Sequence, residues 1–227
     1  MNLEYTHQIA DKYGLGAAAH DVAVRAVNKL GHFEILHAMV LTMDTLDRSY
    51  LEGPGFTWGF LGEAALLDKA RAEGADLDEA FVRDAMAHGD RCYAALDGDT
   101  LASYGFYSTR PTPIDEHAVL HFDPAYAYMY KGFTRPAYRG KRLHGIGMAR
   151  ATAELVAEGK RGLVSYVRSN NFASLRSCYR LGYRDFGRIV LASFGDVRRA
   201  WASAGCKRFG FRAEVVDAPE AVTARAA

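Results

Sequence analysis

The chain has 227 residues, of which 49% are hydrophobic, so it is long enough to bury one sizeable core. Its 28 Lys and Arg residues nearly balance 27 Asp and Glu residues, and the formal net charge of +1 argues against nucleic acid or an anionic membrane as the main partner. The three widely spaced cysteines match neither a zinc pattern nor a disulfide framework, and no segment resembles a signal peptide or a membrane span, so we expect a cytoplasmic protein without a metal site.

The first part of the chain is predicted to be mainly helical. Residues 1–16 are polar and interrupted by glycine, which indicates a flexible arm. Apolar spacing predicts helices at residues 21–30, 63–73 and 78–88, and a strand at 33–43. A further short helix is expected to run toward Tyr50 from a cap at Asp44 or Thr45, and Asp76 is a candidate cap for the helix at 78–88.

The second part alternates strands and helices. An Asp-Gly turn between two apolar runs predicts a hairpin of residues 92–96 and 101–108. The remaining strands are expected at residues 118–122, 126–133, 162–168, 183–194 and 209–216, the helices at 143–158 and 172–180, and a frayed tail at 217–227. This order predicts an α/β fold with a mixed sheet and a helical crossover between parallel strands.

The segment from Thr134 to Gly147 carries the strongest functional signal. A strand rich in tyrosine leads into a turn with several Arg, Lys and Gly residues, and the turn opens directly into a long helical pattern. The first amides of a helix lack partners within the helix and carry partial positive charge. The segment is therefore expected to bind a phosphate group, and a pyrophosphate suits it best.

From about Cys92 to Phe194 the chain resembles the GCN5-related N-acetyltransferase superfamily. The matching motifs are the strand end at 133–135, the turn at 139–144, Asn171 with Ser174, and Leu181-Gly182-Tyr183. The resemblance implies a central twisted mixed sheet with splayed parallel strands, flanked by helices. It also implies one acyltransferase domain over residues 17–216, with an acceptor-side portion at 17–91 and an acyl-CoA-binding core at 92–194.

The resemblance further implies which residues bind the coenzyme. They are Phe133, Thr134, Arg135, Arg139, Gly140, Lys141, Arg142, Leu143, His144, Gly145, Asn171 and Ser174. Arg142 and His144 stand where the family usually has two glycines, which leaves the backbone donors in place but can alter the path of the loop. Asn171 is equally suited to cap the following helix, with Asn170 as the alternative cap.

The catalytic groups are less well defined. Cys178 occupies the position at which many family members place a tyrosine acid, and Tyr179 lies beside it; Cys178 is also typical of a small buried apolar side chain. Tyr130 lies nearest the usual position of a glutamate base, although Tyr126, Tyr128 and Tyr130 also fit one buried strand face. Candidates for the base are Asp115, Glu116, His117, His121 and a chain of water molecules.

The sequence thus predicts transfer of an acetyl group from acetyl-CoA, or of another acyl group from its CoA ester, to an amine of a small molecule or peptide. The resemblance also leaves room for a homodimer. Two alternatives remain open: a regulatory module that binds acyl-CoA without turnover, and transfer of a longer acyl or an aminoacyl group on the same fold. The aromatic run from Phe56 to Phe60 is expected to wall part of the acceptor pocket.

Overall fold

The computed structural model describes residues 3–53, 55–73 and 77–216. Its helices are α1 (Leu3–Tyr13), α2 (Leu15–Val27), α3 (Glu63–Glu73), α4 (Glu79–His88), α5 (Leu143–Ala157) and α6 (Phe172–Leu181), with short 3₁₀ helices η1 (Arg48–Tyr50), η2 (Pro136–Tyr138) and η3 (Ala204–Phe209). Its strands are β1 (His32–Leu41), β2 (Thr57–Leu61), β3 (Arg91–Asp97), β4 (Thr100–Ser108), β5 (Thr112–Asp115), β6 (Ala118–His121), β7 (Ala127–Thr134), β8 (Leu163–Arg168), β9 (Arg184–Phe194), β10 (Val197–Ala202) and β11 (Arg212–Val215).

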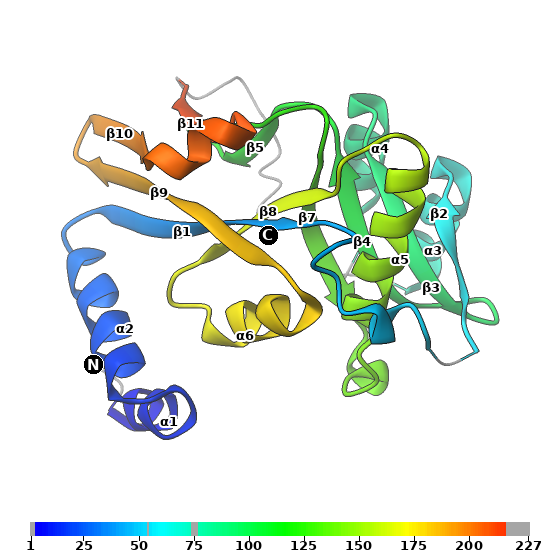
Figure 1. Cartoon of the computed structure of the whole chain (residues 1–227), viewed down its shortest axis with the longest axis horizontal. Helices are drawn as coiled ribbons and strands as arrows, with labels where there is room; N and C mark the ends of the chain where they lie inside the picture. The colour runs from blue at the N-terminus through cyan, green and yellow to red at the C-terminus, as the bar shows by residue number, and fades with distance from the viewer. Residues whose placement is uncertain (1–2, 54, 74–76, 217–227) are drawn as a thin grey trace.

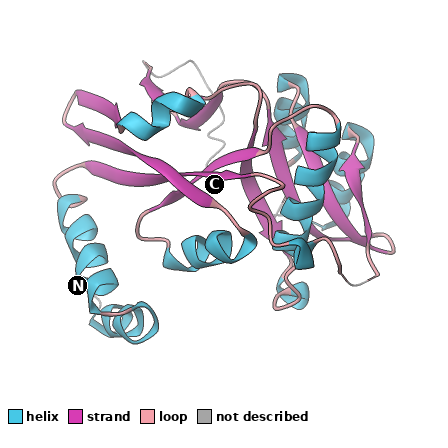
Figure 2. Ribbon diagram, viewed as in Figure 1, coloured by secondary structure: helices cyan, strands magenta, loops and turns pink. Residues whose placement is uncertain are grey.

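The strands form two sheets (Figures 1 and 2). The large sheet has the order β10-β9-β1-β8-β7-β4-β3-β2, and β5, β6 and β11 form a small antiparallel sheet in the order β11-β6-β5. In the large sheet β7 and β8 are parallel, joined through α5, and the other neighbouring strands are antiparallel. The N-terminal strand β1 lies between β8 and β9, so residues far apart in the chain build the centre of the sheet.

Side-chain alternation along β7 divides the core between the two faces of the large sheet. Tyr126, Tyr128 and Tyr130 point into a cluster that includes Leu66 of α3, Phe81 of α4 and Phe209 of η3. Ala127 and Met129 point into a second cluster with Ile146 of α5 and Leu175 of α6. Helices α5 and α6 therefore share one face of the sheet, and α3, α4 and the small sheet with η3 cover the other.

The predicted fold class is confirmed, as are the strand at β1, helices α3 and α4, and the hairpin β3–β4. The alternating series from β7 to β9 also lies where the sequence placed it, with ends that differ by one or two residues. Asp78 caps α4, because its side chain accepts the hydrogen bond from the Phe81 amide. Asp76 and the tail at 217–227 lie outside the described residues.

Four predictions of secondary structure were wrong. Residues 3–13 of the expected arm form α1, whose Ile9 is buried, and α2 begins at Leu15 rather than at residue 21. The helix toward Tyr50 is only the 3₁₀ turn η1, and Asp47 caps it. The last strand starts at Arg212, because residues 204–209 form η3. Strands β2, β5 and β10 were missed, since they are short, and contain a glycine, a proline and an arginine pair respectively.

Within the described part of the chain, no helix combines the length and apolar character needed to cross a bilayer.

Candidate functional site

The parallel strands β7 and β8 separate soon after they meet. They pair only at Ala127 with Leu163 and at Tyr128 with Val164. Beyond these residues β7 stays paired with β4 and β8 stays paired with β1, so the two strands are held apart by their outer neighbours. We call this divergence the opening between β7 and β8. Ser165 Oγ donates across it to the Met129 carbonyl at 2.8 Å. Beyond that contact, strand edges of this kind can hydrogen-bond an extended, amide-bearing chain.

A β-bulge bends β7 within this opening. Gly105 of β4 faces Gly132, whereas the next residue, Phe106, faces Tyr130, so Lys131 is an extra residue on β7. The ring of His144 lies against Gly132, where an added Cβ would come within 2.2 Å of the ring carbon Cε1. Burial lowers the pKa of His144, so its imidazole is neutral at pH 7. His144 thus occupies the space that a side chain at position 132 would need.

The turn between β7 and α5 presents backbone donors at the end of the opening. Gly140 has φ 84° and Arg142 has φ 61°, and Arg142 is the sole non-glycine residue with positive φ in the described ranges. Arg142 therefore adopts the left-handed conformation that glycine would adopt, at a cost of about 1–2 kcal/mol. It precedes Leu143, the first residue of α5, and no side chain caps this helix. The first amides of α5 are consequently available to an anion.

A hollow of about 260 Å³ lies at the start of α5. We call it the turn hollow; its lining residues are Tyr50, Thr134, Tyr138, Arg139, Gly140, Arg142, Leu143, His144, Gly145, Ser177 and Arg180. Three of these described residues are arginines and none is a carboxylate. The helix terminus and the side chains therefore both favour a negatively charged ligand.

Tyr50 forms the wall of the turn hollow opposite the turn. The Arg142 guanidinium lies 3.8 Å from the centroid of the Tyr50 ring, and its Nη2 donates to Ser49 Oγ at 3.4 Å. An added Cβ at Gly145 would come within 2.6 Å of the Tyr50 ring, so glycine at this position lets α5 and η1 approach closely. Tyr50 was not predicted to belong to the site, because nothing in the local sequence links η1 to α5.

The predicted coenzyme residues fall into two groups. Seven line the turn hollow: Thr134, Arg139, Gly140, Arg142, Leu143, His144 and Gly145. Five do not: Phe133, Arg135, Lys141, Asn171 and Ser174.

Asn171 caps α6, because its Oδ1 accepts the Ser174 amide at 3.1 Å, whereas Asn170 bonds to Asp21 of α2. The alternative cap at Asn170 was therefore wrong. Tyr138, Ser177 and Arg180 also line the turn hollow, although none of them was predicted to do so.

The three catalytic candidates lie in different surroundings. Tyr130 is 5% exposed, and its hydroxyl donates to the buried Asp90, which also contacts His88 Nδ1 at 2.8 Å. Cys178 packs at the edge of the core cluster beneath α6. The Tyr179 hydroxyl points from α6 toward β1 and β9, where it donates to Asp185 at 3.1 Å and lies 3.4 Å from His37 Nδ1. Their side chains do not converge on one point.

Cys178 is expected to resist alkylation in the folded protein. Burial raises the pKa of its thiol to about 12. At pH 8 the thiolate fraction is then on the order of 10⁻⁴, whereas an ordinary cysteine would be about one quarter ionised. Peptide mapping by mass spectrometry after iodoacetamide treatment should find Cys178 unlabelled in native protein and labelled in urea. Labelling of Cys178 in the native protein at the rate of a free thiol would contradict its burial.

No protein-family model matches the chain, and no curated protein is similar to it. Among the residues that the structure describes, no three His, Cys, Asp or Glu side chains are grouped so as to hold a metal ion.

Several solved structures are similar to the chain at low identity. A GNAT-family acetyltransferase from Colwellia psychrerythraea is 15% identical, with a TM-score of 0.49 over 77% of this chain and 61% of its own. A GCN5-related N-acetyltransferase from Sphaerobacter thermophilus is 12% identical, with a TM-score of 0.47 over 85% and 56%. An N-acetyltransferase from Staphylococcus aureus Mu50 is 14% identical, with a TM-score of 0.43 over 71% and 99%. The chain thus spans less than two thirds of the first two.

Proposed function

We propose that this protein is an acyltransferase of the GCN5-related N-acetyltransferase type, which transfers an acetyl or related acyl group from CoA to an amine. One combination of features supports the proposal above all others. The opening between β7 and β8 suits an extended chain of amides, and the turn hollow at its end suits a diphosphate. A ligand that is amide-bearing in one part and polyanionic in the other matches both.

In this arrangement Arg139, Arg142 and the first amides of α5 bind the pyrophosphate. Arg180 adds a further positive charge from the side of α6. The pantetheine arm lies along the free edge of β7 and brings the thioester toward the bulge at Lys131. A backbone N–H near Phe133 or Thr134 stabilises the developing oxyanion.

Transfer proceeds by direct attack of the amine on the thioester carbonyl. The amine must be neutral, so a base or an ordered water takes its proton. The C–N bond forms as the C–S bond breaks, and the CoA thiolate leaves and takes up a proton. Cys178 and Tyr179 are the two candidates for the donor. Burial raises the pKa of both side chains, so each is protonated at neutral pH but is a weak acid toward the thiolate. Neither side chain lines the turn hollow.

Release of CoA tests the proposal. The full chain is incubated with acetyl-CoA and a panel of small amines and peptides, and free CoA and acylated product are measured by mass spectrometry against a blank without amine. Product formation with at least one amine is the expected result. Calorimetric binding of acetyl-CoA without turnover across the panel would instead indicate a regulatory module, and absence of binding would refute the coenzyme site.

A further inference from the structure

A second hollow lies on another side of α6. It has a volume of about 660 Å³ and lies between α6, the helices α1 and α2, and His37 of β1. We call it the α2–α6 groove. Its size is in the range of sites that bind small organic molecules. Among the residues that the structure describes, Arg180 alone lines both this groove and the turn hollow, so the groove is a separate place in the fold.

The walls of the groove are mainly apolar and aromatic. Phe172, at the start of α6, lies 5.4 Å from the ring of Tyr13 and 6.4 Å from the ring of His20, measured between centroids. Leu175, one turn further along α6, is 7% exposed. A flat hydrophobic ring would find aromatic and aliphatic contacts on several sides here.

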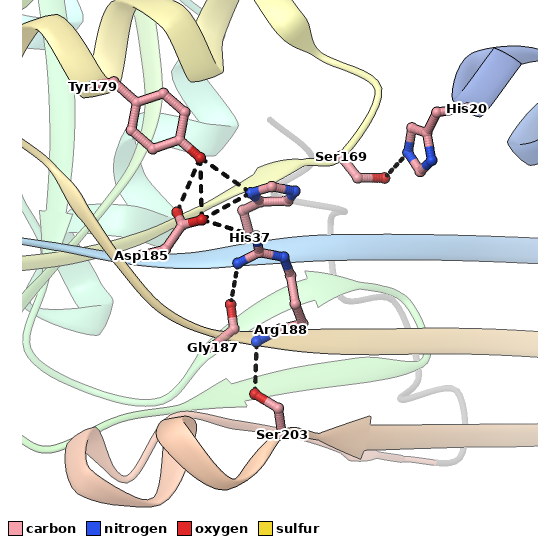
Figure 3. Close-up of polar contacts among 8 residues, drawn as sticks. All are labelled: His20, His37, Ser169, Tyr179, Asp185, Gly187, Arg188 and Ser203. Carbon is pink, nitrogen blue, oxygen red and sulfur yellow. Dashed lines mark hydrogen bonds and ion pairs between the residues drawn. The ribbon is translucent and has the colours of Figure 1, made fainter. Parts of the chain in front are cut away.

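A histidine ring that contacts a carboxylate contributes to the groove. His37 Nδ1 lies 3.4 Å from Asp185 Oδ2, and the same carboxylate accepts the Tyr179 hydroxyl and is paired with Arg188 at 2.8 Å. The Tyr179 hydroxyl also lies 3.4 Å from His37 Nδ1. In the tautomer that donates the Nδ1 hydrogen to Asp185, Nε2 is an acceptor. Figure 3 shows this second nitrogen on the side of the ring toward Ser169 and His20. Burial, together with the charge of Arg188, lowers the pKa of His37 and keeps the ring neutral.

The charges of the groove are complementary to an anion. Arg176 and Arg180 are exposed on α6 at its rim, and no carboxylate of the described part of the chain lines the groove. The nearest acidic side chains are already neutralised, since Asp185 pairs with Arg188 and Asp21 pairs with Arg25 at 2.7 Å. Adjacent arginine side chains are well suited to a carboxylate.

We propose that the α2–α6 groove binds a hydroxylated aromatic carboxylate. The ring contacts Phe172 and Leu175, the carboxylate pairs with Arg176 and Arg180, and the ring hydroxyl donates to His37 Nε2. The proposal does not depend on acyl transfer, because its lining residues other than Arg180 are absent from the turn hollow.

Calorimetry with 4-hydroxybenzoate as the probe tests this site in the full chain. We expect saturable binding, with at least tenfold weaker binding of 4-hydroxybenzamide, which lacks the charge, and about three- to tenfold weaker binding of benzoate, which lacks the hydroxyl. Equal affinity for the acid and the amide would overturn the charge argument.

Two variants locate the probe. Arg176→Gln should reduce its affinity about tenfold, and His37→Phe should remove the preference for 4-hydroxybenzoate over benzoate. Arg208→Gln, an exposed arginine of η3 on the other face of the sheet, serves as the control and should change nothing. Unfolding curves verify that each variant folds. An unchanged affinity in Arg176→Gln, or full displacement of the probe by CoA, would place the probe elsewhere and refute the proposal.

Discussion

Arg139→Glu is expected to weaken CoA binding by on the order of 100-fold while leaving the fold intact. Arg139 is exposed at the turn hollow, and its Nε reaches the Thr134 carbonyl oxygen only at 3.4 Å, so the fold gains little from its side chain. Reversal of its charge replaces an attraction to the pyrophosphate with a repulsion, and a charged hydrogen bond alone contributes about 1.5–3 kcal/mol. Isothermal calorimetry with CoA measures the loss.

Arg208→Glu is the matched control, since it makes the same change in net charge on the face of the sheet opposite the turn hollow. Its CoA affinity should stay within about twofold of the parent, because charges more than a Debye length of about 8 Å apart are screened at physiological salt. The affinity of the parent should fall as salt is added, and that of Arg139→Glu should fall less. Equal affinities for Arg139→Glu and the parent would show that the pyrophosphate does not bind at this turn.

The turn was predictable from sequence because its determinants are local. A strand, a basic glycine-containing turn and a helix follow one another within about twenty residues, and the amide donors belong to the helix terminus itself. The two departures from the family pattern were also informative. Arg142 takes up the left-handed backbone that a glycine would adopt, and His144 fills the space left by Gly132. Neither the backbone conformation of Arg142 nor the packing of His144 against Gly132 can be predicted from the local sequence.

The remaining parts of the site depend on contacts that are distant in sequence. Tyr50 meets Arg142 and Gly145 from a segment almost one hundred residues away, and it belongs to η1, where the sequence predicted an ordinary short helix. The insertion of β1 between β8 and β9 places His37 beside Asp185, a pair that no spacing motif encodes. Tertiary contacts of this kind override local propensity, so the first ninety residues were the least predictable.

Gly182→Ala is expected to lower the free energy of unfolding by about 2–5 kcal/mol. Gly182 ends α6 with φ 111°, a conformation that costs a residue with a Cβ about 1–2 kcal/mol. An added Cβ would also lie 2.0 Å from the Thr45 carbonyl oxygen, so the backbone of the segment leading to η1 must move. Overpacking against rigid surroundings costs about 1–3 kcal/mol more. Urea denaturation followed by circular dichroism measures the loss.

Gly159→Ala separates the two costs. Gly159 also follows a helix and has φ 99°. Apart from its chain neighbours, no atom of the described residues lies within 4 Å of its added Cβ, so this variant should lose only the 1–2 kcal/mol of backbone strain. The Asp47 amide donates to the Leu181 carbonyl at 3.0 Å, which ties the end of α6 to η1. Displacement of this segment should carry Tyr50 away from Arg142, and Gly182→Ala should therefore also bind CoA more weakly than Gly159→Ala does. Equal losses of stability in the two variants would mean that the contact with Thr45 relaxes freely, and η1 would then not depend on the end of α6 for its position.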